Sequence, residues 1–183
     1  MFGLVIGWLV IVALIGFVLM AFGAEKIEIV IATMQRGVGK SLGSGLMGQL
    51  AIVPGAVAVA VLLAATLIGI LLIPLGLVAF MFFVAGVAMF GFVAVATMTG
   101  AAIIRGSHRD ATPHGAMLRA FLTGTIAFLS VWLLAAALHR VPLLGMMLES
   151  FAIAVTFIAV TTGFGAVLLS WWRGEFRPAA GGA

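Results

Sequence analysis

The sequence predicts an all-α integral membrane protein, a polytopic helical bundle in which five transmembrane helices cross the bilayer. Hydrophobic residues make up 65% of the 183 residues and charged residues only 8%, whereas a soluble domain is about half apolar and a quarter charged. One small core could not hide so much apolar surface. The apolar residues fall into long stretches, and each can supply the roughly 20 residues that a bilayer core of about 30 Å requires. Because backbone groups in lipid must be satisfied within the segment, these stretches are predicted to be helices.

The first predicted transmembrane helix occupies residues 1–23 and is interpreted as an uncleaved signal anchor. No basic residue precedes its apolar core, and cleavage with export would place Lys26, Arg36 and Lys40 opposite the other basic residues. Residues 24–44 follow as a cytoplasmic interfacial segment. It is predicted to be a short helix lying at the membrane surface, followed by closely spaced glycines that let the chain bend into the next span.

This segment contains Gly39-Lys40-Ser41, the end of a phosphate-binding loop pattern. The pattern also requires a leading glycine, but Met34 occupies that position, and no buried strand is predicted before it. We therefore expect no bound nucleotide. Lys40 is interpreted as an interfacial anchor whose ammonium group reaches the lipid phosphates.

Residues 45–104 are predicted to form the first transmembrane hairpin. Its turn is placed at Pro74, which cannot donate a backbone hydrogen bond and is flanked by glycines. Pro54 could either kink the helix before this turn or end a short interfacial piece. The sequence leaves open whether Leu42–Pro54 spans the bilayer or lies in the interface.

Residues 105–116 are predicted to be a cytoplasmic loop, residues 117–172 a second transmembrane hairpin, and residues 173–183 a cytoplasmic tail. The second hairpin turns at Pro142–Gly145 and repeats the plan of the first. This similarity indicates either a parallel internal repeat or a coincidence.

The basic residues predict the orientation. One side receives eight of them and the other side receives Arg140 alone, so the N-terminus is expected outside and the C-terminus in the cytoplasm of a multi-pass bacterial inner membrane protein. The eight are Lys26, Arg36, Lys40, Arg105, Arg109, Arg119, Arg173 and Arg177. Side chains expected to anchor the helices at the interface are Lys40, Arg105, Arg119, Trp171, Trp172 and Arg173.

No set of residues points to catalysis or to a bound group. The chain has no cysteine, its histidines lie at predicted membrane ends, and no carboxylate lies near the centre of a predicted span. We therefore expect a protein that is not an enzyme and that has no catalytic residue, metal site, cofactor, nucleotide or nucleic acid. Arg140 and Glu149 flank the second turn and are expected to form an exposed, weak salt bridge on the outer face.

Uncharged polar and small residues are expected to pack the helices, with pore lining as the alternative for the threonines. Pairs of small residues four apart, Ala96/Gly100 and Ala159/Gly163, allow close helix approach. The third span carries phenylalanines on all sides, which predicts contact with lipid or with another subunit. The residues expected to make this contact are Phe80, Phe83, Gly86, Phe90 and Gly91.

Two stretches resemble a known domain. "TLIGILLIPLGLVAFMFFVAGVAMFGFVAVA" (66–96) and "HRVPLLGMMLESFAIAVTFIAVTTGFGAVLL" (139–169) are similar to the hairpins of an uncharacterised bacterial membrane domain. That domain occurs in or beside bactofilin-type and other polymer-forming proteins, and the resemblance covers roughly residues 24–172. It implies a membrane scaffold or anchor rather than an enzyme, and it supplies no catalytic residues.

The sequence thus predicts a non-enzymatic scaffold or accessory subunit of a larger membrane complex, acting through helix–helix and lipid contacts. Its expected partners are membrane lipids and other membrane subunits or further copies of the chain. The alternative is a small oligomeric channel or transporter with a threonine-lined path. The scarcity of polar residues inside the predicted spans favours the scaffold.

Overall fold

The computed structural model describes residues 2–104, 113–138 and 142–176, which form five helical elements and contain no strand. They are α1 (Phe2–Arg36), α2 (Val38–Ala64), α3 (Leu67–Ile104), α4 (Pro113–Leu138) and α5 (Pro142–Trp172). The all-helical prediction is therefore confirmed. Helices α2 to α5 are the four that are long and apolar enough to cross a membrane in the part of the chain that was placed.

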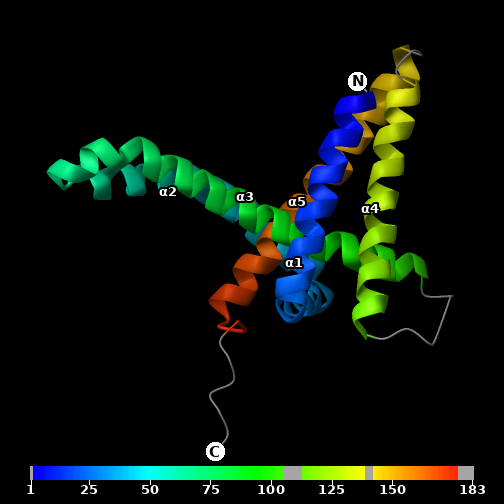
Figure 1. Cartoon of the computed structure of the whole chain (residues 1–183), viewed down its shortest axis with the longest axis horizontal. Helices are drawn as coiled ribbons and strands as arrows, with labels where there is room; N and C mark the ends of the chain where they lie inside the picture. Colours follow the sequence, from blue (N-terminus) through cyan, green and yellow to red (C-terminus); the bar gives the residue numbers. More distant parts are fainter. Residues whose placement is uncertain (1, 105–112, 139–141, 177–183) are drawn as a thin grey trace, which may run out of the picture.

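A kink at Gly23 divides α1 into two helices. Its backbone leaves the helical range (φ −134°, ψ 19°), so the second half, residues 24–36, runs crosswise to the first half, residues 2–22 (Figure 1). The break falls at the predicted end of the first apolar helix. A second break at Gly37, whose backbone is extended (φ 171°), separates α1 from α2.

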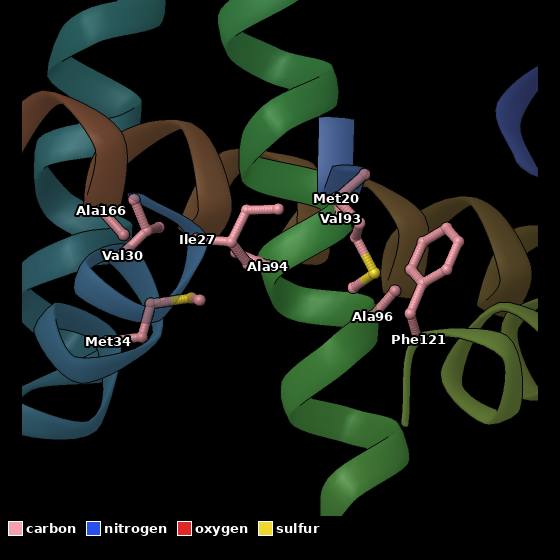
Figure 2. Packing of buried hydrophobic residues seen from close by; sticks show 9 residues of the cluster. All are labelled: Met20, Ile27, Val30, Met34, Val93, Ala94, Ala96, Phe121 and Ala166. Atoms are coloured by element: carbon pink, nitrogen blue, oxygen red, sulfur yellow. The ribbon is translucent and has the colours of Figure 1, made fainter. Parts of the chain in front are cut away.

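The short helix predicted after Gly23 is present, and its apolar face packs on protein. Ile27, Val30 and Met34 are at most 1% exposed, whereas Glu25 and Lys26 are exposed. The three buried side chains lie between α3 and α5 (Figure 2). The apolar face of this helix thus packs into the protein core, and its position at the membrane surface stays a prediction.

The turn between α2 and α3 lies earlier than the sequence predicts. Helix α2 ends at Ala64 and α3 begins at Leu67, so the turn predicted at Pro74 is wrong. The reason is a cap: the Thr66 hydroxyl accepts a hydrogen bond from the Gly69 amide at 3.0 Å and so starts the helix. Pro54 also lies inside a helix, and α2 runs through it unbroken from Val38.

The helices form two hairpins that diverge. Hairpin α2–α3 extends away from α4, α5 and the first half of α1, which rise together on the other side (Figure 1). Helix α3 packs on α4 and α5, and α2 packs on α5, but α2 and α4 do not touch within the described residues. The core lies where the hairpins meet and combines residues of α1, α3, α4 and α5 (Figure 2): Met20, Ile27, Val30, Met34, Val93, Ala94, Ala96, Phe121 and Ala166.

Candidate functional site

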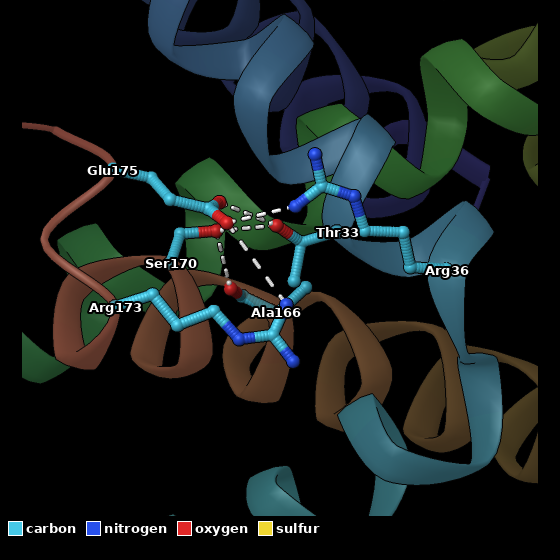
Figure 3. A network of polar contacts seen from close by, with 6 residues as sticks. All are labelled: Thr33, Arg36, Ala166, Ser170, Arg173 and Glu175. Carbon is cyan, nitrogen blue, oxygen red and sulfur yellow. Dashed lines mark hydrogen bonds and ion pairs between the residues drawn. The ribbon is translucent and has the colours of Figure 1, made fainter.

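Polar side chains gather where the end of α5 meets the second half of α1, and we call these five residues the clamp: Thr33, Arg36, Ser170, Arg173 and Glu175 (Figure 3). The Glu175 carboxylate accepts a hydrogen bond from Arg36 Nη1 at 2.8 Å and another from Thr33 Oγ1 at 3.0 Å. Arg173 Nη1 lies 3.9 Å from the same carboxylate. The clamp thus ties the first helix to the last across the whole length of the chain.

The backbone at the end of α5 aims Glu175 at α1. Gly174 has a left-handed conformation (φ 69°), its amide donates to the Trp171 carbonyl at 3.0 Å, and the Glu175 amide donates to the Ser170 carbonyl at 3.1 Å. These two bonds make up the Schellman motif, in which a glycine ends a helix and reverses the chain. Phe176 then packs against the core.

Two buried hydroxyls link the carboxylate to the helix interior. Thr33 is 2% exposed and Ser170 is fully buried, and their oxygens lie 2.9 Å apart. Ser170 Oγ is also 2.9 Å from the Ala166 carbonyl. Because Thr33 donates its proton to Glu175, Ser170 donates either to Thr33 or to Ala166, and every buried hydroxyl in the clamp keeps a partner.

The groups of the clamp hold α1 and α5 together. Its carboxylate accepts from Thr33 and from Arg36, and the hydroxyls of Thr33 and Ser170 are buried between the helices. Among the residues that the structure places, no three His, Cys, Asp or Glu side chains are grouped so that they could hold a metal ion. The exposed ion pairs contribute little, whereas the buried hydroxyl contacts fix the geometry.

Glycine and other small residues form the helix crossings. A side chain at Gly100 would collide with the backbone of Ala120, and one at Gly124 would collide with the backbone of Ala96. The predicted close approach at Ala96/Gly100 is thus confirmed, and its partner is α4. At Gly163 the neighbouring backbone is Gly91 of α3, so the second predicted pair also marks a crossing.

A third crossing, between α2 and α5, did not emerge from the sequence. Gly45 faces the backbone of Thr161, and Gly165 faces the backbone of Ser41. Both helices carry small residues four apart at this point, Ser41/Gly45 and Thr161/Gly165, which is the signal that a full scan would have found. Gln49 Nε2 donates to Thr161 Oγ1 at 3.0 Å beside the same crossing.

The third crossing explains the stretch that resembles a phosphate-binding loop. Gly37 is the break before α2, Lys40 is exposed in its first turn, and Ser41 is fully buried against α5. The Ser41 hydroxyl is therefore enclosed by helix packing rather than presented at a loop. Of the glycines of this stretch, Gly37 forms the break before α2 and Gly45 forms the crossing.

The residues predicted to contact a partner fall into two groups. Phe83 is 68% exposed, and nothing within 4 Å would meet a side chain at Gly86. Phe80 lies over Gly55 of α2, and Phe90 packs against the core. For Gly91 the prediction is wrong, because α5 of the same chain fills the position.

The predicted interfacial anchors that the structure describes are exposed. Trp171 and Trp172 are 67% and 82% exposed at the end of α5, and Lys40, Arg119 and Arg173 are exposed as well. Arg105 and Arg140 lie outside the described residues, and so does the predicted salt bridge from Arg140 to Glu149.

The sequence did not predict the clamp. Gly174, directly after Arg173, is nevertheless a signal for the end of a helix, and the clamp lies at that end.

Comparison with protein families, curated proteins and solved structures finds no match to this chain. The resemblance to the membrane domain of polymer-forming proteins therefore stays a prediction.

Proposed function

We propose that this chain is a non-enzymatic, five-span protein of the bacterial inner membrane that serves as a scaffold or accessory subunit. The observation that carries the proposal is the way its polar groups are used. Gln49 bonds to Thr161 and Trp132 to Thr156, both between helices, at 3.0 and 3.1 Å. Thr97 donates to the Val93 carbonyl at 2.7 Å. Gln49 and Trp132 thus link helices, and the Thr97 hydroxyl is satisfied within its own helix, while many large apolar side chains are exposed.

The fifth span would be the first half of α1. Ile11, Leu14, Phe17 and Val18 are each at least 50% exposed there, as expected of a helix facing lipid. The kink at Gly23 follows, and then the charged residues of the second half. The length of residues 2–22 matches the roughly 20 residues of a span.

The orientation proposal places the clamp in the cytoplasm. Arg36 and Arg173 meet at Glu175, at the same end of the molecule. Positive charge concentrates on the cytoplasmic side of inner membrane proteins. A phosphatase fused after Ala183 should therefore be inactive and a fluorescent protein fused there bright, and the reverse pair of results would contradict five spans with this orientation.

The channel alternative has less support. Thr97, Thr125 and Thr161 are buried at helix crossings, and two of them hydrogen-bond to the protein itself. A threonine-lined path would require such hydroxyls to face water. Ion flux into proteoliposomes that tracked the amount of purified protein would favour the channel over the scaffold.

The partner surface that fits the proposal is the exposed part of α3 around Phe83 and Gly86. A photo-crosslinking residue in place of Phe83, in cells that express the natural neighbours, should give a discrete protein adduct. Gly86→Leu should abolish the adduct because the added side chain blocks close approach. Gly43→Leu is the matched control, since Gly43 also faces open space. Lipid adducts alone, or an adduct that survives Gly86→Leu, would contradict the proposed surface.

A further inference from the structure

Three basic side chains gather where α1 ends, α2 begins and α5 ends. Arg36 Nη1 and Arg173 Nη1 lie 2.8 and 3.9 Å from the same oxygen of Glu175, so one carboxylate faces two guanidinium groups (Figure 3). The stem of Lys40 folds back toward this place, because a side chain at Gly37, the residue after Arg36, would lie 3.6 Å from Lys40 Cδ. We call Arg36, Lys40 and Arg173 the basic patch.

The basic patch carries more positive charge than the protein neutralises. Among the described residues, Glu175 is the only carboxylate in contact with the three side chains, so two of the three positive charges remain. The first turn of α2 adds no acidic residue. An arginine has five N–H donors, and within the described contacts Arg36 uses only Nη1. Since all three side chains are exposed, the basic patch can bind an anion without losing a contact to the protein.

The basic patch lies where two apolar helices end. Helix α2 is apolar enough to span a membrane from its first residue, and α5 is so up to its last. Lys40 lies in the first turn of α2, and Arg173 directly follows α5. The two ends lie close together, because Gly165 of α5 packs on the backbone of Ser41. In a membrane, both ends would therefore reach the same layer of lipid headgroups.

Two exposed tryptophans adjoin the basic patch. Trp171 and Trp172 are 67% and 82% exposed and directly precede Arg173, and indole rings favour the headgroup layer. Guanidinium and ammonium groups bind phosphate oxygens through charge-assisted hydrogen bonds. A zwitterionic lipid also carries a cation, which the excess positive charge would repel. The basic patch therefore fits an anionic phospholipid better than a zwitterionic one.

From these observations we infer that the basic patch binds the headgroup of an anionic phospholipid, whose phosphate accepts hydrogen bonds from the N–H donors that the protein leaves unused. Glu175 keeps the two guanidinium groups together, and its own negative charge opposes the bound anion. The inference rests on the membrane location proposed above. It deepens that proposal by naming the class of lipid and the side chains that select it.

The lipid that copurifies with the full-length protein tests the inference. The protein is reconstituted in vesicles of equal phosphatidylglycerol and phosphatidylcholine and extracted in mild detergent, and the retained lipids are quantified by mass spectrometry. We expect several-fold more phosphatidylglycerol than phosphatidylcholine. Arg36→Gln combined with Lys40→Gln should remove most of this preference, since each basic residue strengthens the binding of anionic lipid about five-fold. Lys26→Gln combined with Arg119→Gln removes the same charge from exposed positions outside the basic patch and should keep the preference.

Glu175→Gln distinguishes lipid binding from a purely structural role. The substitution weakens the ion pairs of the clamp but removes the negative charge beside the bound anion, so the preference for phosphatidylglycerol should rise. If Arg36→Gln and Glu175→Gln instead lowered the preference alike, the basic patch would act only through the clamp, and the inference would be wrong. Lys40→Gln alone changes no contact of the clamp and should still lower the preference about five-fold.

A distance measurement shows that the variants stay folded. Spin labels at Ser44→Cys and Leu168→Cys, on either side of the α2–α5 crossing, should remain close together in each of them. The natural chain has no cysteine, so only these two positions are labelled.

Two further outcomes separate this inference from the proposed membrane location. Equal retention of the two lipids by the unsubstituted protein would overturn the inference and would indicate another anion, such as an acidic segment of a partner protein, while the membrane location would stand. Protein that failed to float with the vesicles in a density gradient would contradict the membrane location, and the inference with it.

Discussion

Among the residues between Leu46 and Phe90 whose side chains the structure describes, hairpin α2–α3 buries only Gly69, whereas hairpin α4–α5 buries residues along most of its length. Hydropathy does not explain this difference, since α3 is the most apolar of the four long helices. Lipid tails are as apolar as a leucine side chain. Apolar surface therefore favours insertion of a helix into the membrane, but it does not drive that helix to pack against another helix. The buried residues of this chain instead lie where small residues let helices cross closely and where α1 packs beside the second hairpin.

The same comparison shows where the stability of the fold resides. The crossings of α3 with α4 and α5, and of α2 with α5, lie within the buried region, and the clamp adds a polar tie at its edge. The far half of hairpin α2–α3 contributes only the contact between its own two helices. Changes in the two regions should therefore have very different consequences.

The largest effect is expected from Phe121→Ala. Phe121 on α4 is fully buried and its ring lies against Gly16 of α1. Removing it should leave a cavity and lower the free energy of unfolding by about 3–5 kcal/mol. Phe82→Ala on α3, where the side chain is 74% exposed, is the matched control and should have little effect.

Unfolding of both variants by denaturing detergent in mixed micelles provides the measurement. Equal losses for Phe121→Ala and Phe82→Ala would break the comparison, because they would mean that the far half of hairpin α2–α3 is as tightly packed as the core.

The next largest effect separates two glycines of one helix. Gly45 of α2 faces the Thr161 backbone, while nothing within 4 Å would meet a side chain at Gly43. Gly45→Leu should therefore force α2 and α5 apart and cost about 1–3 kcal/mol. Gly43→Leu should be neutral or should stabilise the helix by up to about 1 kcal/mol, through the better helix propensity of leucine.

The same unfolding assay measures this pair, and loss of the short distance between labels at Ser44 and Leu168 would report the separation of the helices. A Gly45→Leu protein with wild-type stability and an unchanged distance would show that the α2–α5 crossing is not as close as the structure places it.

Much of this architecture could be predicted from the sequence, because the features are local. The apolar stretches predict the helices, and the glycine at 23 coincides with the end of the first one. The turn predicted at Pro74 is wrong because proline does not break α3 there, whereas the Thr66 hydroxyl caps α3 eight residues before Pro74. Proline is tolerated inside membrane helices when neighbouring groups compensate for the lost bond.

The rest could not be predicted because it depends on contacts between distant residues. Thr33 and Glu175 are 142 residues apart. No motif around either residue indicates that the two side chains would contact each other. Gly91 was expected to face a partner, since the sequence does not reveal that Gly163 of the same chain takes that place. A small residue predicts a close approach, but the identity of its neighbour comes only from the fold.

A smaller effect is expected where α5 ends. Gly174 has a left-handed backbone (φ 69°), and a Cβ atom in that conformation costs roughly 1–2 kcal/mol. Gly174→Ala should lower stability by about that amount, and Gly174→Asn should lower it less, because Asn tolerates this conformation better. If Ala and Asn have equal effects, the backbone conformation is not the reason for the glycine.

The smallest effect concerns the charges of the clamp, which tie α5, and with it the second hairpin, to α1. Side chains of Arg36 and Glu175 are 63% and 24% exposed, and ion pairs this open to solvent contribute about 0.2–1 kcal/mol. A double-mutant cycle of Arg36→Gln and Glu175→Gln should give a coupling in this range at low salt. The coupling should fall in 1 M salt, where the screening length is about 3 Å. Glu175→Gln keeps an oxygen that can accept from Thr33, so the hydroxyl contacts persist and only the charge is tested.

A coupling well above this range, unchanged by salt, would show that the clamp is shielded from water and holds the second hairpin more strongly than its exposure implies. In that case the difference between the two hairpins would owe as much to this polar tie as to the glycine crossings.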